Sequence, residues 1–429
     1  MYHKSKLKNG ITLITVPVKG TMATTILAMF PVGSRYENKA LSGASHFVEH
    51  MLFKGTKRRP EAVDISRTLE AVGAEYNAFT NKDYTGYYVK IDAQKQAIAF
   101  DLLSDMIYNS VIEPAEVEKE KGAIVEELRM YIDNPTMAVD LLSDRITFGD
   151  NQLGWDIGGT ADSVRAITRE MLWEYYQKHY SPRNMVLVVA GNVSSAKIKK
   201  LTEDFSAQAA PKGALPLNFY AKKFDHFKWP ERHVSLEERV AVETRKVDQT
   251  QVILNFPALP NNHPDRFALT ILLTILGSGM SSRLFVEVRE KRGLAYMIRA
   301  GSGSFRDVGS WHIQAGLDPK RLKEALTVIR GELEKMTKEP ITKRELVDAQ
   351  NNVAGQLALS MEDSSTQAEW YAKQFLFAKE TLTPEEVVRR LKKVTIHDVE
   401  RLARQLFKWN QLRLAVIGPL MKKDILPLV

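Results

Sequence analysis

Two histidines and one glutamate fall within five residues of the stretch SGASHFVEHMLFKGT, residues 42–56, at His46, Glu49 and His50. On a helix, His46 and His50 are i and i+4, so both imidazoles project from one face and Glu49 lies beside them. Two neutral imidazoles at this spacing can chelate one Zn²⁺ ion, and the carboxylate can then reach a water bound to the ion. The alternative interpretation is a helix with two unrelated histidines, and a third ligand from elsewhere in the chain would decide between the two.

A short helix must position these three side chains. Ser42 is a suitable N-cap and Gly55 is a suitable residue just past the C-terminus, so the sequence predicts a helix that runs to Lys54. Phe47 and Met51 provide apolar surface for packing that helix into a core.

A second segment, EPAEVEKEKGAIVEELRMYIDNP at residues 113–135, is rich in carboxylates. Pro114 suits the first turn of a helix, and Pro135 ends it. Glu120 and Glu127 are seven residues apart and therefore lie on one face of that helix. The composition singles out no ligand, and by itself the segment is also typical of a solvated helix face.

The bulk composition is that of a globular protein. The chain has 429 residues, enough for two domains of roughly 200 residues, with 44% hydrophobic and 26% charged residues. It contains no cysteine, which excludes disulfides, thiolate metal sites and cysteine nucleophiles. Lys and Arg exceed Asp and Glu by 60 − 52 = 8, but the basic residues are interleaved with acidic ones, so we expect no nucleic-acid partner.

Neither the interior nor the start of the sequence predicts a membrane segment. The longest apolar run, residues 267–277, is well short of the ~20 residues that a membrane span needs. The first residues, MYHKSKLKNGITLITVPV, alternate like a strand and lack the apolar core and small-residue cleavage site of a signal peptide. We therefore expect a cytoplasmic protein with no membrane partner.

Two pairs of segments repeat along the chain at nearly the same offset. A helix-then-strand segment that begins at Thr168 matches one that begins at Thr395, an offset of 395 − 168 = 227, so that the strands VLVVAG and RLAVIG fall opposite each other. The strand segments TTILAMFPVGS and TQVILNFPALP match at an offset of 226. This pattern indicates a duplicated unit.

Each half mixes strands with long helices. Residues 76–91, YNAFTNKDYTGYYVKI, predict a hairpin, and residues 92–110 predict a helix. We predict the α+β fold class, with two duplicated, structurally similar domains, each a mostly antiparallel sheet covered by helices on one face. A Pro-, Ala- and Lys-rich linker at residues 208–236 would separate an N-terminal catalytic domain, residues 1–207, from a C-terminal domain without metal, residues 237–429.

The order His46-Phe47-Val48-Glu49-His50 is the H-x-x-E-H pattern of the inverzincins, the mirror of H-E-x-x-H. With the downstream glutamates, it makes the chain resemble, over essentially its whole length, the pitrilysin/insulinase family of zinc metallopeptidases. The resemblance is strongest to the short-chain branch that includes the mitochondrial processing peptidase β subunit and its bacterial relatives. In that family the third ligand is a glutamate on a later helix, with another glutamate two turns before it.

The resemblance implies that Glu127 is the third zinc ligand, because Glu120 precedes it by 127 − 120 = 7 residues. Glu126 also suits the family in its separation from His50 along the sequence, 126 − 50 = 76 residues. The residue seven positions before Glu126 is Lys119, however, which does not match the family. We therefore choose Glu127 as the ligand and Glu120 as a second group that orients the site.

Two further elements are similar to the family. YNAFTNKDYTGYY resembles its edge strand, whose backbone pairs with an extended peptide substrate, and this implicates Asn77, Ala78 and Phe79. SGMSSRLFVEVREKRGLAY resembles its Arg/Tyr element, in which Arg289 and Tyr296 would bind the substrate backbone and help to stabilise the oxyanion. Without the resemblance, Arg289 would be a surface charge near a helix end and Tyr296 a strand residue that packs inward.

The duplication predicts one zinc ion per chain. At an offset of 226, the residues of the second half that correspond to the three ligands are Leu272, Leu276 and Val353. Apolar side chains stand there in place of ligands.

The resemblance implies a zinc endopeptidase whose peptide substrates, short or unfolded, enter between two halves of a clamshell. Glu49 would act as the general base. Because one chain carries both the zinc motif and the Arg/Tyr pair, we expect a homodimer that needs no specialised partner chain. Two alternatives stay open: a subunit of a hetero-oligomeric processing peptidase that needs a partner chain, and a non-catalytic scaffold of the same fold.

Overall fold

The computed structural model describes residues 2–207, 224–230 and 234–429. Most of the predicted linker, residues 208–223 and 231–233, lies outside the described residues. The chain forms two compact units, of which the first comprises residues 1–129, 156–225 and 360–381 and the second comprises residues 130–155, 226–359 and 382–429.

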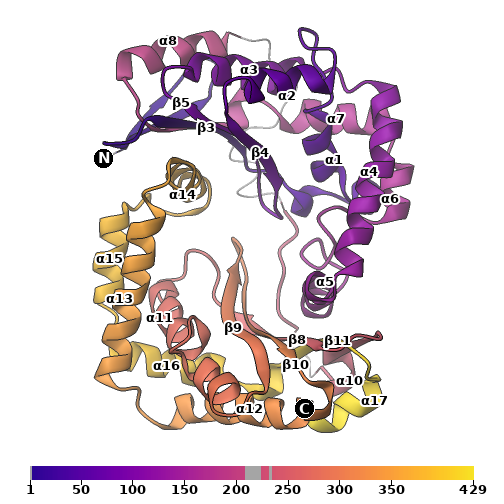
Figure 1. The fold of residues 1–429 in the computed structure, drawn as a ribbon, viewed down its shortest axis with the longest axis vertical. Coiled ribbons are helices and arrows are strands. Elements are labelled where there is room, and N and C mark those ends of the chain that lie inside the picture. The colour runs from indigo at the N-terminus through magenta and orange to yellow at the C-terminus, as the bar shows by residue number, and fades with distance from the viewer. Residues whose placement is uncertain (1, 208–223, 231–233) are drawn as a thin grey trace. The chain divides into compact units, whose positions relative to one another are not determined.

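The first unit is built on a six-stranded sheet in the order β1-β2-β6-β3-β5-β4 (Figure 1). Its strands are β1 (His3–Lys6), β2 (Thr12–Pro17), β3 (Ala23–Phe30), β4 (Glu75–Thr80), β5 (Thr85–Asp92) and β6 (Val186–Gly191). Neighbouring strands are antiparallel except for β2 and β6, which are parallel. The hairpin predicted for residues 76–91 is confirmed as β4 and β5.

Helices cover both faces of this sheet. On β3, Ile26, Ala28 and Phe30 face one apolar cluster, and Leu27 and Met29 face another, as the two-residue period of a strand requires. Strands buried on both faces read as continuous apolar runs, which explains the composition of β3 and β6. The helices of this unit are α1 (Ala44–Met51), α2 (Ala62–Glu70), α3 (Gln96–Asn109), α4 (Pro114–Asp133, which extends into the second unit), α6 (Ala161–Ala166), α7 (Arg169–His179), α8 (Ser195–Ser206) and α14 (Ser364–Phe377).

The second unit has a five-stranded sheet in the order β7-β11-β8-β10-β9. Its strands are β7 (Val240–Thr244), β8 (Thr250–Ala258), β9 (Ala295–Ser304), β10 (Gly309–Leu317) and β11 (Arg413–Gly418). Only β7 and β11 are parallel neighbours among these. The helices of this unit are α5 (Pro135–Phe148), α10 (Leu236–Arg239), α11 (Arg266–Gly277), the π-helical segment η4 (Phe285–Glu290), α12 (Leu322–Lys338), α13 (Lys343–Ser360), α15 (Pro384–Lys392), α16 (Ile396–Leu406) and α17 (Lys422–Ile425).

The two sheets share one topology, which confirms the predicted duplication. The order β2-β6-β3-β5-β4 and its strand directions are those of β7-β11-β8-β10-β9. The register agrees as well, because Thr25 pairs with Ala190 while Gln251, 251 − 25 = 226 positions later, pairs with Ile417, 417 − 190 = 227 positions later. Two mostly antiparallel sheets with helices confirm the α+β fold class.

Each sheet is covered on one face by a helix from the other half of the sequence (Figure 1). Helix α14 packs on β3 and β6 through Ala368 and Tyr371, and α5 packs on β8 and β11 through Ala138 and Val139. The expectation of helices on one face only is therefore wrong, because strands that are apolar on both sides need cover on both. Because α14 and α5 each pack on the sheet of the other half of the sequence, the two compact units are not contiguous halves of the chain.

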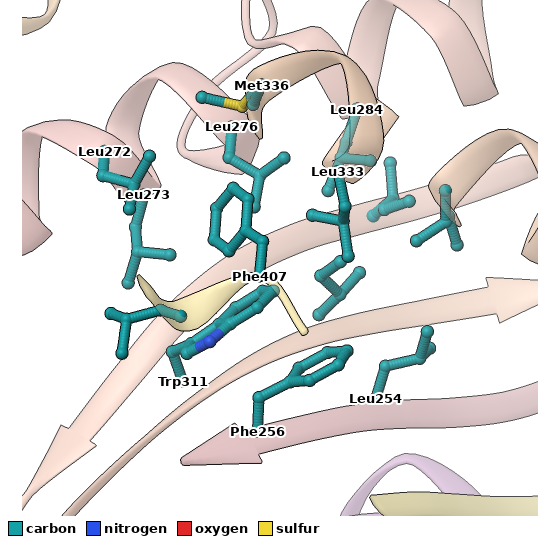
Figure 2. Packing of buried hydrophobic residues seen from close by; sticks show 14 of the residues in the cluster. Leu254, Phe256, Leu272, Leu273, Leu276, Leu284, Trp311, Leu333, Met336 and Phe407 are labelled. Atoms are coloured by element: carbon teal, nitrogen blue, oxygen red, sulfur yellow. The ribbon is translucent and has the colours of Figure 1, made fainter. Parts of the chain in front are cut away.

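The core of the second unit forms around a stack of aromatic rings (Figure 2). The rings of Phe256 and Trp311 are parallel within 9°, with centroids 4.3 Å apart, and Phe407 packs on the same indole at 4.7 Å. Leu272 and Leu276 extend from α11 into this cluster. Apolar burial of this kind is the main source of the unit's stability.

No helix in the described part of the chain combines the length and apolar composition that a membrane crossing needs.

Candidate metal centre

Helix α1 (Ala44–Met51) carries the three residues of the H-x-x-E-H motif. Its N-cap is Gly43, with φ of +96°, so the prediction of Ser42 as the cap is wrong. The carboxylate of Glu37 accepts hydrogen bonds from the backbone N–H groups of Gly43 (2.8 Å) and Ser45 (2.7 Å). A buried side chain from the preceding turn thus satisfies two of the backbone donors at the start of the helix.

The opposite side of α1 is anchored in the core. Phe47, Val48 and Met51 have no exposed surface. Their burial fixes the rotation of the helix about its axis, so His46 and His50 both project from the remaining face. The predicted extension of the helix to Lys54 is too long, because α1 ends at Met51 and a turn follows.

Helix α4 (Pro114–Asp133) supplies the two predicted carboxylates, with the bounds that its flanking prolines indicate. The side chain of Glu120 is 5% exposed and that of Glu127 is 26% exposed, and both approach the histidines of α1. Glu126 instead is 68% exposed and pairs with Arg129. The rotational phase of α4 therefore favours Glu127 over Glu126, a choice that spacing alone leaves open.

Three donor atoms meet between α1 and α4. Nε2 of His46 lies 3.2 Å from Nε2 of His50, and Oε2 of Glu127 lies 3.6 Å and 3.4 Å from these two atoms. A tetrahedral zinc ion with bonds of about 2.1 Å holds its ligand atoms about 3.4 Å apart. The donor atoms of His46, His50 and Glu127 therefore have the separations that such an ion would require. Among the described residues, they are the one group of three with donor atoms close enough to hold a metal ion.

Glu120 orients the ring of His50. Its Oε1 lies 2.8 Å from Nδ1 of His50, so a proton on Nδ1 is donated to the carboxylate and Nε2 is presented to the metal position. Burial lowers the pKa of His50, but hydrogen bonds with Glu120 and then with Glu127 outweigh it and raise the pKa to about 9. A metal ion held by Nε2 of His50 would therefore have to displace a proton from the ring.

The ring of His46 is in a different environment. Its Nδ1 is buried and has no hydrogen-bond partner in the part of the chain that the structure describes. Burial, and next the neighbouring His50, lower the pKa of His46 to about 4. The imidazole is therefore neutral at physiological pH, the form that binds a metal.

Glu49 is held beside the two histidines by a contact with the sheet. Its Oε2 accepts a 2.5 Å hydrogen bond from the hydroxyl of Thr80, at the end of β4. Burial raises the pKa of Glu49, and the bond from Thr80 acts in the opposite direction. A carboxylate with a raised pKa and one fixed oxygen is suited to accept a proton and return it.

The predicted edge-strand residues Asn77, Ala78 and Phe79 lie on β4, which pairs only with β5 among the described strands. The N–H of Ala78 donates to the side-chain Oδ1 of Asn77 (2.9 Å) and not to β5, so it belongs to the free edge of the sheet. The ring of Phe79 lies across Gly86 on the neighbouring strand, where an added Cβ would approach it to 2.4 Å. The side of β4 that faces away from β5 carries this N–H, on the strand that ends at Thr80, the partner of Glu49.

The structure also brings Arg289 and Tyr296 together in the second unit. The guanidinium of Arg289 lies over the rings of Phe285 (4.7 Å) and Tyr296 (5.0 Å), and its Nη1 donates to the backbone carbonyl of Tyr296 at 2.9 Å. Tyr296 is 75% exposed on the edge strand β9, so the alternative of an inward-packed tyrosine is wrong. The pair therefore presents a planar cation and a phenol to solvent.

The corresponding positions of the second unit hold no ligands. Leu272 and Leu276 are fully buried on α11, as Figure 2 shows, and Val353 packs against the same cluster. The apolar replacement that the repeat predicts is therefore part of a hydrophobic core.

Three residues near the metal position were not recognised in the sequence: Glu37, Thr80 and Lys54. Lys54 carried a local signal, since it follows His50 by four residues, and its ammonium lies 2.6 Å from Glu120. Thr80 shares a strand face with Ala78, two residues earlier, so the period of two could have indicated it. Glu37 carried no such signal, because its role depends on how a loop folds back onto α1.

Comparison with known proteins places this geometry in a family. The family model described as Insulinase (Peptidase family M16) matches residues 16–161, and the model described as Peptidase M16 inactive domain matches residues 166–353. The chain belongs to peptidase family M16. The resemblance to the pitrilysin/insulinase family is thereby confirmed, and the inactive-domain match covers the half with Leu272, Leu276 and Val353.

Relatives of this M16 chain extend over nearly its full length. An uncharacterized zinc protease of Streptomyces coelicolor is 37% identical over 424 residues, 98% of this chain and 90% of that protein. An uncharacterized zinc protease of Bacillus subtilis is 32% identical over 419 residues, 98% of each. Together with the family, these relatives support a metallopeptidase that uses zinc.

Solved structures agree with the M16 fold. A protease from Helicobacter pylori superposes with a TM-score of 0.89 at 25% identity, covering 98% of this chain and all of that one. A structure described as the peptidase M16 inactive domain from Pseudomonas fluorescens superposes with a TM-score of 0.87 at 19% identity, which shows the fold alone.

Proposed function

We propose that this M16 peptidase is a zinc-dependent endopeptidase of the H-x-x-E-H type that hydrolyses short or unfolded peptides, with one zinc ion per chain. The observation that carries the proposal is the spacing of the donor atoms of His46, His50 and Glu127, 3.2–3.6 Å apart, with Glu49 on the same helix as the histidines. A structural helix face has no need of three converging donors, two of which belong to half-buried imidazoles.

The side chains divide the chemistry among them. When bound, zinc supplies a water of lowered pKa and polarises the carbonyl of the substrate. Glu49 takes the proton of the attacking water and later returns it to the leaving amine. Thr80 fixes Oε2 of Glu49, which leaves Oε1 to exchange the proton. Glu120 holds His50 in the orientation that ligation requires.

The free edge of β4 is the proposed docking strand for the substrate. An extended peptide can add to this edge along Asn77, Ala78 and Phe79, through the backbone groups of β4 that point away from β5, which is possible only for a segment without its own secondary structure. Arg289 and Tyr296 are proposed to bind the substrate backbone and to help stabilise the developing oxyanion.

The assembly and location of the enzyme are part of the same proposal. Because a single chain carries the zinc motif, the edge strand and the Arg/Tyr pair, a homodimer without a specialised partner is the simplest active form. We place it in the cytoplasm.

The test is cleavage of an internally quenched, unstructured peptide by the purified full-length chain, with and without zinc. The matched variant is Glu49→Gln, which keeps the size of the side chain and lies outside the set of ligands. We expect Glu49→Gln to bind zinc normally and to lose at least about 100-fold in kcat.

Two outcomes would contradict the proposal in different ways. Cleavage that Glu49→Gln leaves unchanged would remove Glu49 as the base. Normal zinc binding without any cleavage by the wild type, across a library of unstructured peptides, would favour a processing subunit that needs a partner chain, or a scaffold.

A further inference from the structure

Two short polar contacts lead from Lys54 to the ring of His50. The ammonium of Lys54 lies 2.6 Å from Oε2 of Glu120, and the other oxygen of the same carboxylate, Oε1, lies 2.8 Å from Nδ1 of His50. Each oxygen of Glu120 thus has one partner. The carboxylate is 5% exposed, so water contributes little to holding it in place.

The backbone around Lys54 is fixed. Gly55, which follows it, has φ of +135°, and a Cβ there would lie 2.4 Å from the carbonyl oxygen of Pro60. The hydroxyl of Thr56 then donates to Asp105 at 2.6 Å, which ties the turn to α3. Lys54 is therefore held in the turn that follows α1, from which its side chain reaches Glu120.

The charges around the two imidazoles give Lys54 a second effect. Glu49, Glu120 and Glu127 carry formal charges that sum to −3, and Lys54 brings the total to −2, equal and opposite to a Zn²⁺ ion.

Among the described residues, Lys54 is the only lysine or arginine that pairs with Glu120. Its removal would leave a buried oxygen of Glu120 without a donor, and the carboxylate would gain by turning away from His50.

We propose that Lys54 is a positioning residue of the metal site, which acts on His50 through Glu120. Its ammonium holds one carboxylate oxygen so that the other accepts the Nδ1 proton of His50 and Nε2 points at the metal. This inference rests on the proposed function, since it concerns affinity for the zinc ion that His46, His50 and Glu127 would hold.

The experiment measures the zinc dissociation constant of the full-length chain by competition with a chromogenic chelator at one neutral pH. The variants are Lys54→Met, Lys54→Arg, Glu120→Gln and the double variant Lys54→Met/Glu120→Gln. The control is Lys57→Met, which removes the same charge from an exposed position three residues away. Circular dichroism melting of each metal-free variant establishes that it is folded.

We expect Lys54→Met to weaken zinc binding about 10-fold, in line with other outer contacts of metal ligands. Lys54→Arg keeps the charge and the donors and should restore most of the affinity. Lys57→Met should stay within about twofold of the wild type, because an exposed charge is screened. In the Glu120→Gln background, Lys54→Met should cost less than about twofold, because its effect passes through the carboxylate.

Three results would overturn the inference: unchanged or tighter zinc binding by Lys54→Met, an equal loss in Lys57→Met, or a full loss that persists in the Glu120→Gln background. The arginine variant keeps the test valid if Lys54→Met does not fold, because poor binding by a folded Lys54→Arg chain would also contradict it. Failure of the wild type to bind zinc would instead contradict the proposed function itself.

Discussion

The hydrogen bond between Thr80 and Glu49 allows the role of the proposed base to be separated from metal binding. Thr80→Val removes the hydroxyl and keeps the shape of the side chain. The lost bond is 2.5 Å long and is made to a carboxylate that is largely buried. Hydrogen bonds to charged groups contribute about 1.5–3 kcal/mol, which corresponds to a change of at least about 10-fold in an equilibrium or rate.

Two consequences follow for Thr80→Val. We expect kcat to fall at least about 10-fold at neutral pH, because Glu49 loses its fixed orientation. The bond from Thr80 opposes the rise in the pKa of Glu49, so its loss should raise that pKa further and shift the acidic limb of kcat/KM to higher pH.

The assay compares the pH profiles of peptide cleavage for the wild type, Thr80→Val and Thr80→Ser, with the zinc dissociation constant measured in parallel. Thr80→Ser retains the donor and should recover most of the activity. Zinc affinity should be unchanged in both variants, because Thr80 contacts the proposed base Glu49 and none of the proposed zinc ligands. An unaltered kcat and pH profile in Thr80→Val, or a parallel loss of zinc, would refute this reasoning.

Three further predictions concern stability and substrate binding. Burial lowers the pKa of His179 to about 3, so this imidazole stays neutral in the folded chain, whereas in the unfolded chain it takes up a proton below pH ~6.5. Between pH 6.5 and 5, the free energy of unfolding should therefore fall by about 2 kcal/mol more in the wild type than in His179→Phe. An equal fall in both proteins, measured by denaturant titration at the two pH values, would contradict this. Gly43→Ala should lower the free energy of unfolding by more than about 2 kcal/mol, because φ is +96° and the added Cβ would lie 2.5 Å from the carbonyl oxygen of Gly158. The control is Gly73→Ala, where φ is +65° and an added Cβ would meet no atom within 4 Å, and it should lower that free energy by less. Arg289→Lys loses the guanidinium that lies over the rings of Phe285 and Tyr296 and should lower kcat/KM about 10-fold with unchanged zinc affinity. Unaltered cleavage would remove this pair from the proposed machinery.

Much of the metal site could be predicted because its pattern is local. The spacing of His46, Glu49 and His50 determines which helix face they share, whatever the helix packs against. The same holds for Glu120 and Glu127 on α4. The choice between Glu127 and Glu126 needed the rotational phase of α4, which is set by its buried residues and is not visible in the spacing of the carboxylates.

Other features depend on contacts between distant residues. The cap of α1 comes from Glu37, whose carboxylate outcompetes the adjacent Ser42 only because a loop folds back onto the helix. The strands β3 and β8 are apolar on both faces and need cover on both, which the expectation of helices on one face missed. The sequence does not indicate which helices supply that cover, because α14 and α5 each pack on a sheet formed by the other half of the chain.

The proposed zinc ion of His46, His50 and Glu127 can be located directly. The most direct measurement is an anomalous difference map, recorded at the zinc absorption edge, from crystals of the zinc-loaded chain. We expect one strong peak per chain, within about 2.0–2.2 Å of Nε2 of both histidines and of a carboxylate oxygen of Glu127. A peak ligated by Glu126, a peak elsewhere in the chain, or no peak in crystals grown with zinc would contradict it.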